Sequence, residues 1–319
     1  MRSSSGTFPF RDINGTVWLA YTDWGISTRE NLLLCVHGHT RQGRDFAKLG
    51  EYFSKDLHTI SFDLAGHGKS GWLSNKEDYS LESSVRHIDG LMDYRGISKV
   101  DWLGTFTGGI LGMIFAARDD SPIRRLILND VGPLLTFGSI KLLLDRFTSN
   151  TVFKDLEDAN VYFRKAYSGC GIVDDVDWSD FIIRSINREV DGTYRLHYDP
   201  AIINELGTIW SNLDVWEVYE KIQCPVLVLR GKESDVLSRE VADRMAQVGP
   251  KAKIIELEDC GNAPVLVNPK CLSIVSKWLS ETNHLIEVED LPPQDKEPVS
   301  YTHLRAPETP EHLVFSLMH

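Results

Sequence analysis

Long apolar runs and an ordered set of cysteines are both missing from this sequence. No apolar run approaches the roughly 18 residues that suggest a membrane span, and the N-terminal stretch MRSSSGTFPFRDING has no apolar segment of the kind found in a secretory signal. The five cysteines are scattered, odd in number and without metal-ligand spacing: Cys35, Cys170, Cys224, Cys260 and Cys271. This pattern favours reduced thiols over disulfides. We therefore expect a soluble, cytoplasmic protein that is not associated with a membrane and has no metal or other cofactor.

Positive charge is also scarce. The sequence has 34 Lys and Arg against 46 Asp and Glu, a net charge of −12, and so lacks the basic surface that nucleic-acid phosphates require. Part of the acidity lies in residues 283–319, which hold seven acidic residues and five of the 13 prolines but show no sustained periodicity. We expect this segment to be a disordered or non-native tail, and we infer no function from it.

What is present is typical of a globular α/β protein, with 42% hydrophobic and 25% charged residues. Residues 8–23 contain two extended runs around Asn14-Gly15, the preferred pair for a two-residue hairpin turn. Short apolar runs then alternate with segments of helical periodicity; the runs are 32–36, 59–62, 100–103, 126–128, 226–229 and 254–257. This alternation predicts a mostly parallel sheet with helices on both faces. The spacing of the apolar residues from Leu81 to Met92 predicts one of these helices.

The alternation stops between residues 128 and 224, where helix-like stretches rich in aromatic residues take its place. We interpret this segment as an inserted helical cap. The predicted organisation is a first core part over 1–133, a cap over 134–222, a second core part over 223–282 and the tail over 283–319. The cap aromatics either roof a substrate pocket or form the cap's own core, since large aromatic side chains dominate burial in any helical layer.

Three segments carry a family resemblance. They are VHGH at 36–39, DLAGHGKS at 63–70 and GTFTGG at 104–109, each following a predicted strand. In this order they resemble the HG loop, the D-x-x-G-x-G-x-S loop and the G-x-S-x-G nucleophile elbow of the α/β-hydrolase superfamily. The resemblance spans about residues 8–282. It is strongest to small bacterial hydrolases that act on esters, lactones or related acyl compounds.

The resemblance implies a triad at three positions, of which only the acid is retained. It places the nucleophile at position 106, the acid at Asp235 and the base at position 262, but this chain has Phe106 and Asn262 there. Phe106 has no hydroxyl, and Asn262 does not titrate near neutral pH. Because loss of a nucleophile or a base alone costs about 10⁶ in turnover in a serine protease, we predict that serine-type hydrolysis is effectively absent.

Binding survives these replacements, because the oxyanion hole implied by the resemblance consists of the backbone amides of His39 and Thr107. The supporting residues that it implies are His37, Gly38, Gly104, Gly108 and Asp130, the last being either a second position for the acid or a loop-bonding residue. A small apolar acyl-type ligand under the cap is therefore the expected partner.

Three functional hypotheses remain open. The chain is a pseudo-hydrolase kept for binding or decaying without function, an active enzyme of altered mechanism, or an inactivated version of a serine hydrolase. The altered mechanism needs the oxyanion hole and a non-covalent base such as Asp63 or His39. His39 and His67 are candidate replacement bases; the alternative is that they only stabilise their loops. Cys260 is a candidate nucleophile; the alternative is that it is an inert thiol. The sequence fixes neither the substrate nor the oligomeric state.

Overall fold

A computed structural model describes residues 3–26, 31–147, 151–203, 211–258 and 260–283. The chain opens with the predicted hairpin, formed by β1 (Ser4–Asp12) and the antiparallel β2 (Gly15–Trp24). Asp12 pairs with Gly15, so the two-residue loop is Ile13-Asn14 and not Asn14-Gly15 as the sequence suggested. Gly15 instead takes a φ of 135° as the first residue of β2, a conformation that a residue without a Cβ adopts readily.

The central sheet has eight strands in the order β1-β2-β4-β3-β5-β6-β12-β13. Its remaining strands are β3 (Leu32–Val36), β4 (His58–Asp63), β5 (Val100–Thr105), β6 (Ile123–Asn129), β12 (Val226–Gly231) and β13 (Lys253–Leu257). All pairs from β4 to β13 are parallel, and β2 joins β4 in antiparallel orientation. Each predicted apolar run lies within one strand, and the prediction of a mostly parallel sheet is confirmed.

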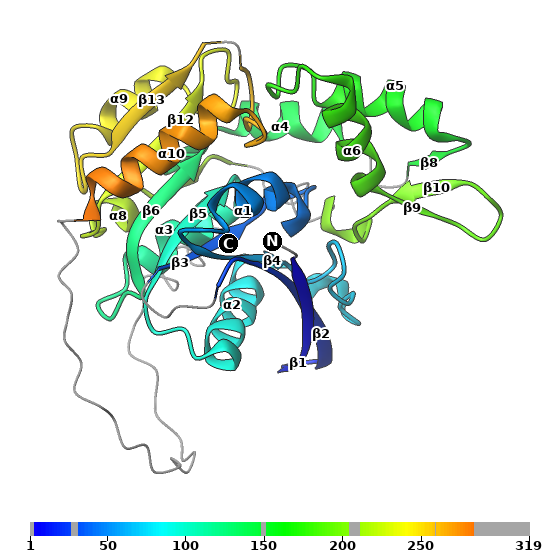
Figure 1. Ribbon diagram of the computed structural model, residues 1–319, viewed down its shortest axis with the longest axis horizontal. Helices are drawn as coiled ribbons and strands as arrows, with labels where there is room; N and C mark the ends of the chain where they lie inside the picture. The colour runs from blue at the N-terminus through cyan, green and yellow to red at the C-terminus, as the bar shows by residue number, and fades with distance from the viewer. Residues whose placement is uncertain (1–2, 27–30, 148–150, 204–210, 259, 284–319) are drawn as a thin grey trace.

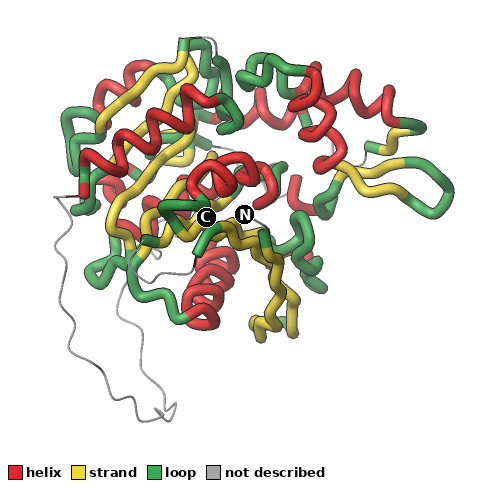
Figure 2. Tube along the Cα trace, viewed as in Figure 1, coloured by secondary structure: helices red, strands yellow, loops and turns green. Residues whose placement is uncertain are grey.

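Helices cover both faces of this sheet (Figures 1 and 2). One core lies against α2 (Leu81–Arg95), α3 (Thr107–Ala116), α8 (Trp216–Glu220) and α9 (Arg239–Met245), and the other against α1 (Ala47–Phe53) and α10 (Pro269–Glu281). Along β3, Leu34 and Val36 join the first core whereas Leu33 and Cys35 join the second. This alternation follows from the two-residue period of a strand, and it explains why β3 is apolar throughout.

The segment between β6 and β12 contains helices and also short strands. Besides α8, which packs on the central sheet, its described helices are α4 (Phe137–Arg146), α5 (Leu156–Ala166) and α6 (Asp175–Ser185). In Figure 1, α5 and α6 lie at the upper right and α4 lies near the top centre. Its strands are β7 (Leu134–Leu135), β8 (Val152–Phe153), β9 (Ile186–Arg188), β10 (Tyr194–Leu196) and β11 (Leu213–Asp214), which form a three-stranded sheet, β8-β10-β9, and a β11-β7 pair. The sequence predicted helices alone here, because strands of two or three residues are too short to show a periodicity.

Within the described part of the chain, no helix is both long enough and apolar enough to cross a membrane. Of the predicted tail, only Asn283 is described; residues 284–319 lie outside the described residues. The division into core and cap stays a prediction.

Candidate active site

The turn between β5 and α3 holds Phe106 in a strained conformation. Phe106 precedes the first residue of α3 with φ 46° and ψ −111°, a region that costs a bulky residue about 1–3 kcal/mol. Close backbone packing imposes this turn: a Cβ on Gly104 would lie 2.2 Å from the carbonyl oxygen of Gly108, and one on Gly108 would lie 2.1 Å from that of Val36. The glycines therefore fix the elbow whatever side chain stands at position 106.

The loop after β3 packs against this elbow. Leu64 N donates to Nε2 of His37 at 3.0 Å, which leaves Nδ1 as the donor to the carbonyl of Gly38 at 2.8 Å. Burial lowers the pKa of His37 well below its ordinary value, so the ring is neutral. A Cβ on Gly38 would lie 3.4 Å from the Cβ of Phe106. His37 thus ties the loops after β3 and β4 together, a structural role.

The rings of His39 and His67 also make contacts with backbone carbonyls of neighbouring loops. The ring of His39 places Nε2 2.9 Å from the carbonyl of Ile202 and Nδ1 3.5 Å from Oγ1 of Thr107. The ring of His67 lies between two carbonyls, with Nε2 2.6 Å from that of His39. Burial lowers the pKa of His39 to about 3, with a smaller contribution from His67. A base with so low a pKa is poorly matched to neutral pH, which weakens the hypothesis of His39 as a replacement base.

The backbone amides of His39 and Thr107 remain available as hydrogen-bond donors to a ligand. Neither donates a hydrogen bond to another residue in the described ranges. The amide of Thr107 is the first of α3, where the helix geometry leaves N–H groups without an internal partner. Both residues share a cavity wall with Phe106, so an acceptor oxygen bound at these amides would lie near the phenyl ring.

Asn262 and Asp235 lie together, as the resemblance implied for the base and acid positions. Oδ1 of Asn262 accepts from the amide of Asp235 at 2.7 Å, and Nδ2 lies 3.5 Å from its Oδ2. The same Oδ2 accepts from Nη2 of Arg146 on α4 at 2.7 Å. The side chain of Asp235 is 48% exposed. This half of the site is therefore a surface hydrogen-bond pair with an added cation, not a buried acid–base couple.

Asp130, at the end of β6, holds the loops beneath this pair. Its buried carboxylate accepts hydrogen bonds from Gly231 N at 3.2 Å, Ser234 Oγ at 2.8 Å and Ala263 N at 2.8 Å. Burial raises the pKa of Asp130 to about 6, against these hydrogen bonds. Ser234 and Ala263 adjoin Asp235 and Asn262 in the chain, so Asp130 positions both loops. This arrangement matches the loop-bonding alternative left open by the sequence.

The carboxylate of Asp63 is likewise engaged in hydrogen bonds within the fold. Its buried carboxylate accepts from Gly43 N at 2.7 Å and Lys69 N at 3.0 Å, and burial raises its pKa to about 6. Asp63 lines neither of the two cavities that Phe106 borders within the described residues. A role as the base of an altered mechanism therefore lacks access to a ligand.

Two cavities meet at Phe106 and His39, which line both. The first, here the acid-side cavity, has about 670 Å³ and is lined among others by Asp130, Leu143, Arg146, Ala166 and Asn262. The second, here the α2-side cavity, has about 730 Å³ and is lined among others by Thr107, Ser83, His87, Ile110 and Ile140. Phe106, only 8% exposed, stands where the two would otherwise join.

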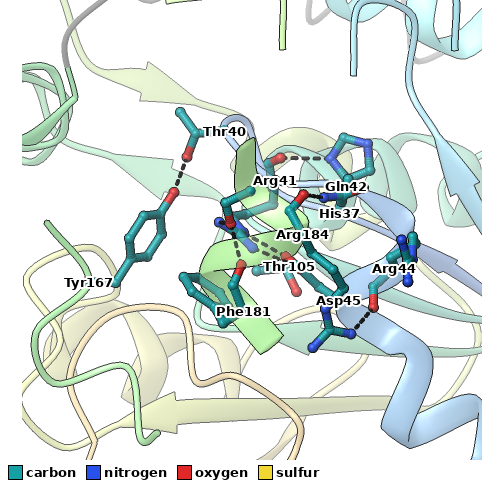
Figure 3. A network of polar contacts seen from close by, with 12 residues as sticks. His37, Thr40, Arg41, Gln42, Arg44, Asp45, Thr105, Tyr167, Phe181 and Arg184 are labelled. Atoms are coloured by element: carbon teal, nitrogen blue, oxygen red, sulfur yellow. Dashed lines mark hydrogen bonds and ion pairs between the residues drawn. The ribbon is translucent and has the colours of Figure 1, made fainter. Parts of the chain in front are cut away.

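A buried polar network joins the loop after β3 to α5 and α6 (Figure 3). Nε and Nη2 of Arg41 donate to the carboxylate of Asp45 at 2.6 and 2.8 Å, and Nη1 donates to Oγ of Ser185 at 2.8 Å. The guanidinium carbon lies 3.8 Å from the ring centroid of Phe181, and Oγ1 of Thr40 lies 2.8 Å from the hydroxyl of Tyr167. Arg41 was not among the residues predicted from the sequence. The only sign of its ion pair in the local sequence is the acidic residue four positions later, Asp45.

Two observations bear on a cysteine nucleophile and on a metal site. Cys260 is buried and forms no disulfide. No group of three or more metal-ligating side chains occurs among the described residues, and none therefore gathers around His37 and His39.

Comparison with known proteins decides the family. The family described as alpha/beta hydrolase fold matches residues 31–269. The chain belongs to the α/β-hydrolase family. It is 32% identical over 272 residues to a 3-hydroxybutyrate-oligomer hydrolase of Cupriavidus necator, covering 82% of this chain and 92% of that protein.

Solved structures agree with this fold. The chain matches a putative hydrolase from Rickettsia typhi with a TM-score of 0.82 and 26% identity, over 88% of this chain and 99% of that one. An α/β hydrolase from Novosphingobium aromaticivorans matches with a TM-score of 0.78 and 23% identity, over 86% and 98% of the two chains. The family and fold expected from the three sequence segments are thus confirmed.

Proposed function

We propose that this α/β hydrolase binds a small acyl-type ligand at the elbow and does not hydrolyse it by the serine mechanism. The observation that carries the proposal is Phe106. It occupies the strained nucleophile position without a hydroxyl, next to two backbone amides that donate to no described residue. Such amides bind a carbonyl or carboxylate oxygen without help from a nucleophile.

Two further features support binding. The cavities on either side of Phe106 are largely apolar, as small-molecule sites generally are. The relative from Cupriavidus necator acts on oligomers of 3-hydroxybutyrate, so a short hydroxyacyl ester is a reasonable ligand class for this chain.

A second candidate function is that of an ester hydrolase disabled by the substitutions at positions 106 and 262. The contact between Asn262 and Asp235 favours it, because position 262 already lies beside the implied acid. In this case the binding site is a remnant, and restoring two side chains restores turnover.

Binding and chemistry are tested on the intact chain. The wild type is expected to resist labelling by a fluorophosphonate and to leave p-nitrophenyl butyrate uncleaved above background, yet to bind methyl butyrate in a calorimetric titration. Ser84→Trp should abolish that binding by filling the α2-side cavity. Ala246→Trp, an exposed control that lines neither cavity, should not. Stoichiometric labelling of any serine, or binding that survives Ser84→Trp, would contradict the proposal.

A further inference from the structure

The α2-side cavity contains a buried nitrogen with no hydrogen-bond partner. It is Nδ1 of His87, a side chain of α2 that is 1% exposed and lines the cavity wall. No described residue provides a partner for this atom. Since most buried polar side-chain atoms in proteins are hydrogen-bonded, an exception on a cavity wall points to a ligand.

The chemistry of Nδ1 is fixed by the other ring nitrogen. Nε2 of His87 lies 2.8 Å from Oδ2 of Asp12, on β1, whose other oxygen accepts from Ile13 N at 2.8 Å and from Arg86 Nε at 3.0 Å. Burial opposes ionisation of Asp12, but hydrogen bonds from Ile13 and His87 lower its pKa overall. A carboxylate only accepts, so the proton of a neutral His87 resides on Nε2.

His87 is neutral, because burial lowers its pKa and outweighs the attraction of Asp12. Nδ1 therefore presents a lone pair, which accepts a hydrogen bond and donates none. The partner that fits it is a donor. A carboxylate cannot donate, and an ammonium ion is costly to bury against an apolar wall. A neutral hydroxyl has neither disadvantage.

Several other polar side chains of this wall are already engaged, among them Asp78, which accepts from Nδ2 of Asn14 at 2.7 Å and from Nδ2 of Asn75 at 3.0 Å. Oγ of Ser83 accepts from Nη2 of Arg86 at 2.9 Å, and Oγ of Ser84 donates to the carbonyl of Ser80 at 2.9 Å. The hydroxyl of Tyr79 donates to Asp199 at 2.7 Å. Most of the remaining wall is apolar, contributed by Leu64, Leu73, Leu135, Ile110, Ile140, Ile202 and Leu213. The wall therefore distinguishes a ligand with one alcohol from a ligand with none.

His39, Phe106 and Thr107 of the elbow line the same cavity as His87. We propose that the α2-side cavity is the subsite for the alcohol-bearing end of a hydroxyacyl ligand, whose hydroxyl donates to Nδ1 of His87 while its carbonyl lies at the elbow amides. This inference rests on the proposed function and refines it, since it names the second functional group of the ligand. It assigns His87 as a specificity-determining residue.

The test compares two esters that differ by one hydroxyl, methyl 3-hydroxybutyrate and methyl butyrate, titrated calorimetrically into the full-length chain. The hydroxy ester should bind about fivefold more tightly, as one net hydrogen bond provides. His87→Phe should bring the two affinities together. His197→Phe is the matched control, because Nε2 of His197 is also buried without a described partner but lines neither cavity. The control should keep the fivefold preference.

Each other result has a defined meaning. Equal affinities in the wild type, as when water satisfies Nδ1 equally well with both esters, overturn this inference and leave the proposed function standing. A preference that survives His87→Phe also overturns it. Binding of neither ester overturns the proposed function and this inference with it. Should His87→Phe fail to fold, ¹⁵N-histidine spectra of the wild type replace it: the Nδ1 signal of His87 should shift with the hydroxy ester alone, and an unchanged signal overturns the inference.

Discussion

The two halves of the candidate site differ in how tightly the fold holds them. The elbow half, with Phe106, His37 and His39, is packed backbone against backbone, and its side chains are mostly buried. The acid–base half consists of Asp235 and Asn262, joined by side-chain contacts and half open to solvent. In one half the elbow persists around Phe106, a side chain without a nucleophilic group. In the other, a hydrogen-bonded pair persists although Asn262 does not titrate.

The difference shows which parts of a hydrolase site are structural. Gly104 is required by the close approach of β5 to α3, Gly108 by that of α3 to β3, and Asp130 by the three donors that it satisfies. None of these roles depends on catalysis. The side chains at 106 and 262 are also part of the fold, since Phe106 is buried in the core and Asn262 accepts a hydrogen bond from Asp235 N.

The most severe test of this comparison is to restore the chemistry. Phe106→Ser with Asn262→His should raise turnover of an aryl ester by about 10³-fold over the wild type, because a positioned base and a nucleophile each contribute in this range. The supporting parts are in place: the elbow glycines, the two amides and Asp235. The measurement is steady-state hydrolysis of p-nitrophenyl butyrate by the purified double variant.

Each single variant is the control for that experiment. Serine without a base is a poor nucleophile, and histidine at 262 has no hydroxyl to activate, so either change alone should recover little and the two should be strongly coupled. A folded double variant with wild-type activity would mean that the geometry of the acid–base half no longer supports catalysis. This result would favour the binding function over a disabled enzyme.

A matched pair of glycines tests the difference in packing. A Cβ on Gly104 would lie 2.2 Å from a backbone oxygen, whereas one on Gly261, next to Asn262, would lie 3.4 Å from its nearest neighbour. Gly104→Ala should therefore cost about 3 kcal/mol or more in the free energy of unfolding, and Gly261→Ala less than about 1 kcal/mol. Urea denaturation of both variants measures this, and equal losses would contradict the comparison.

The elbow half should also contribute to the acid sensitivity of the fold. Since burial lowers the pKa of His39 to about 3, only the unfolded chain takes up this proton as the pH falls through about 6.5. The stability that neutral His39 contributes is complete above pH 6.5 and is lost between pH 6.5 and about 3. By pH 5 the loss is about 2 kcal/mol. Asp63, with its pKa raised to about 6, changes in the opposite direction.

His39→Gln isolates this contribution, because glutamine can still donate to the carbonyl of Ile202 but does not titrate. The variant should lose about 2 kcal/mol less than the wild type between pH 7 and pH 5, with Asp63 contributing equally to both. Denaturant unfolding at the two pH values measures the difference. Parallel losses in the two proteins would show that His39 is protonated in the folded state.

The elements that the sequence predicted well are those whose signal is local. The apolar run at 32–36 is β3, and the glycines at 104 and 108 indicated an elbow because backbone packing admits no other residue there. The hairpin turn was displaced by one residue, because the pairing register of β1 and β2 also depends on their packing.

Long-range contacts account for what the sequence did not reveal. His87 meets a partner 75 residues earlier in the chain, Asp12, and Arg41 bonds to Ser185, 144 residues later. Neither pairing leaves a spacing that a single sequence displays. The short strands of the β8-β10-β9 sheet could not be predicted either, because two or three residues are too few to show an alternating pattern.

The smallest effect is expected at the exposed end of the acid–base half. Asp235→Ala removes the ion pair with Arg146, whose Nη2 lies 2.7 Å from Oδ2 of Asp235, with the two side chains 35% and 48% exposed. Exposed pairs of this kind stabilise proteins by about 0.2–1 kcal/mol and are screened by salt. The free energy of unfolding should therefore fall by less than about 1 kcal/mol, and by less again in 1 M NaCl. Arg146→Ala is the matched control and should give a similar change.

In the Phe106→Ser, Asn262→His background the same Asp235→Ala should instead remove most of the recovered turnover, because the new histidine would lose the carboxylate that orients it. If Asp235→Ala unfolds the wild type as severely as Gly104→Ala, the acid–base half is as rigidly built as the elbow half, and the difference between them disappears.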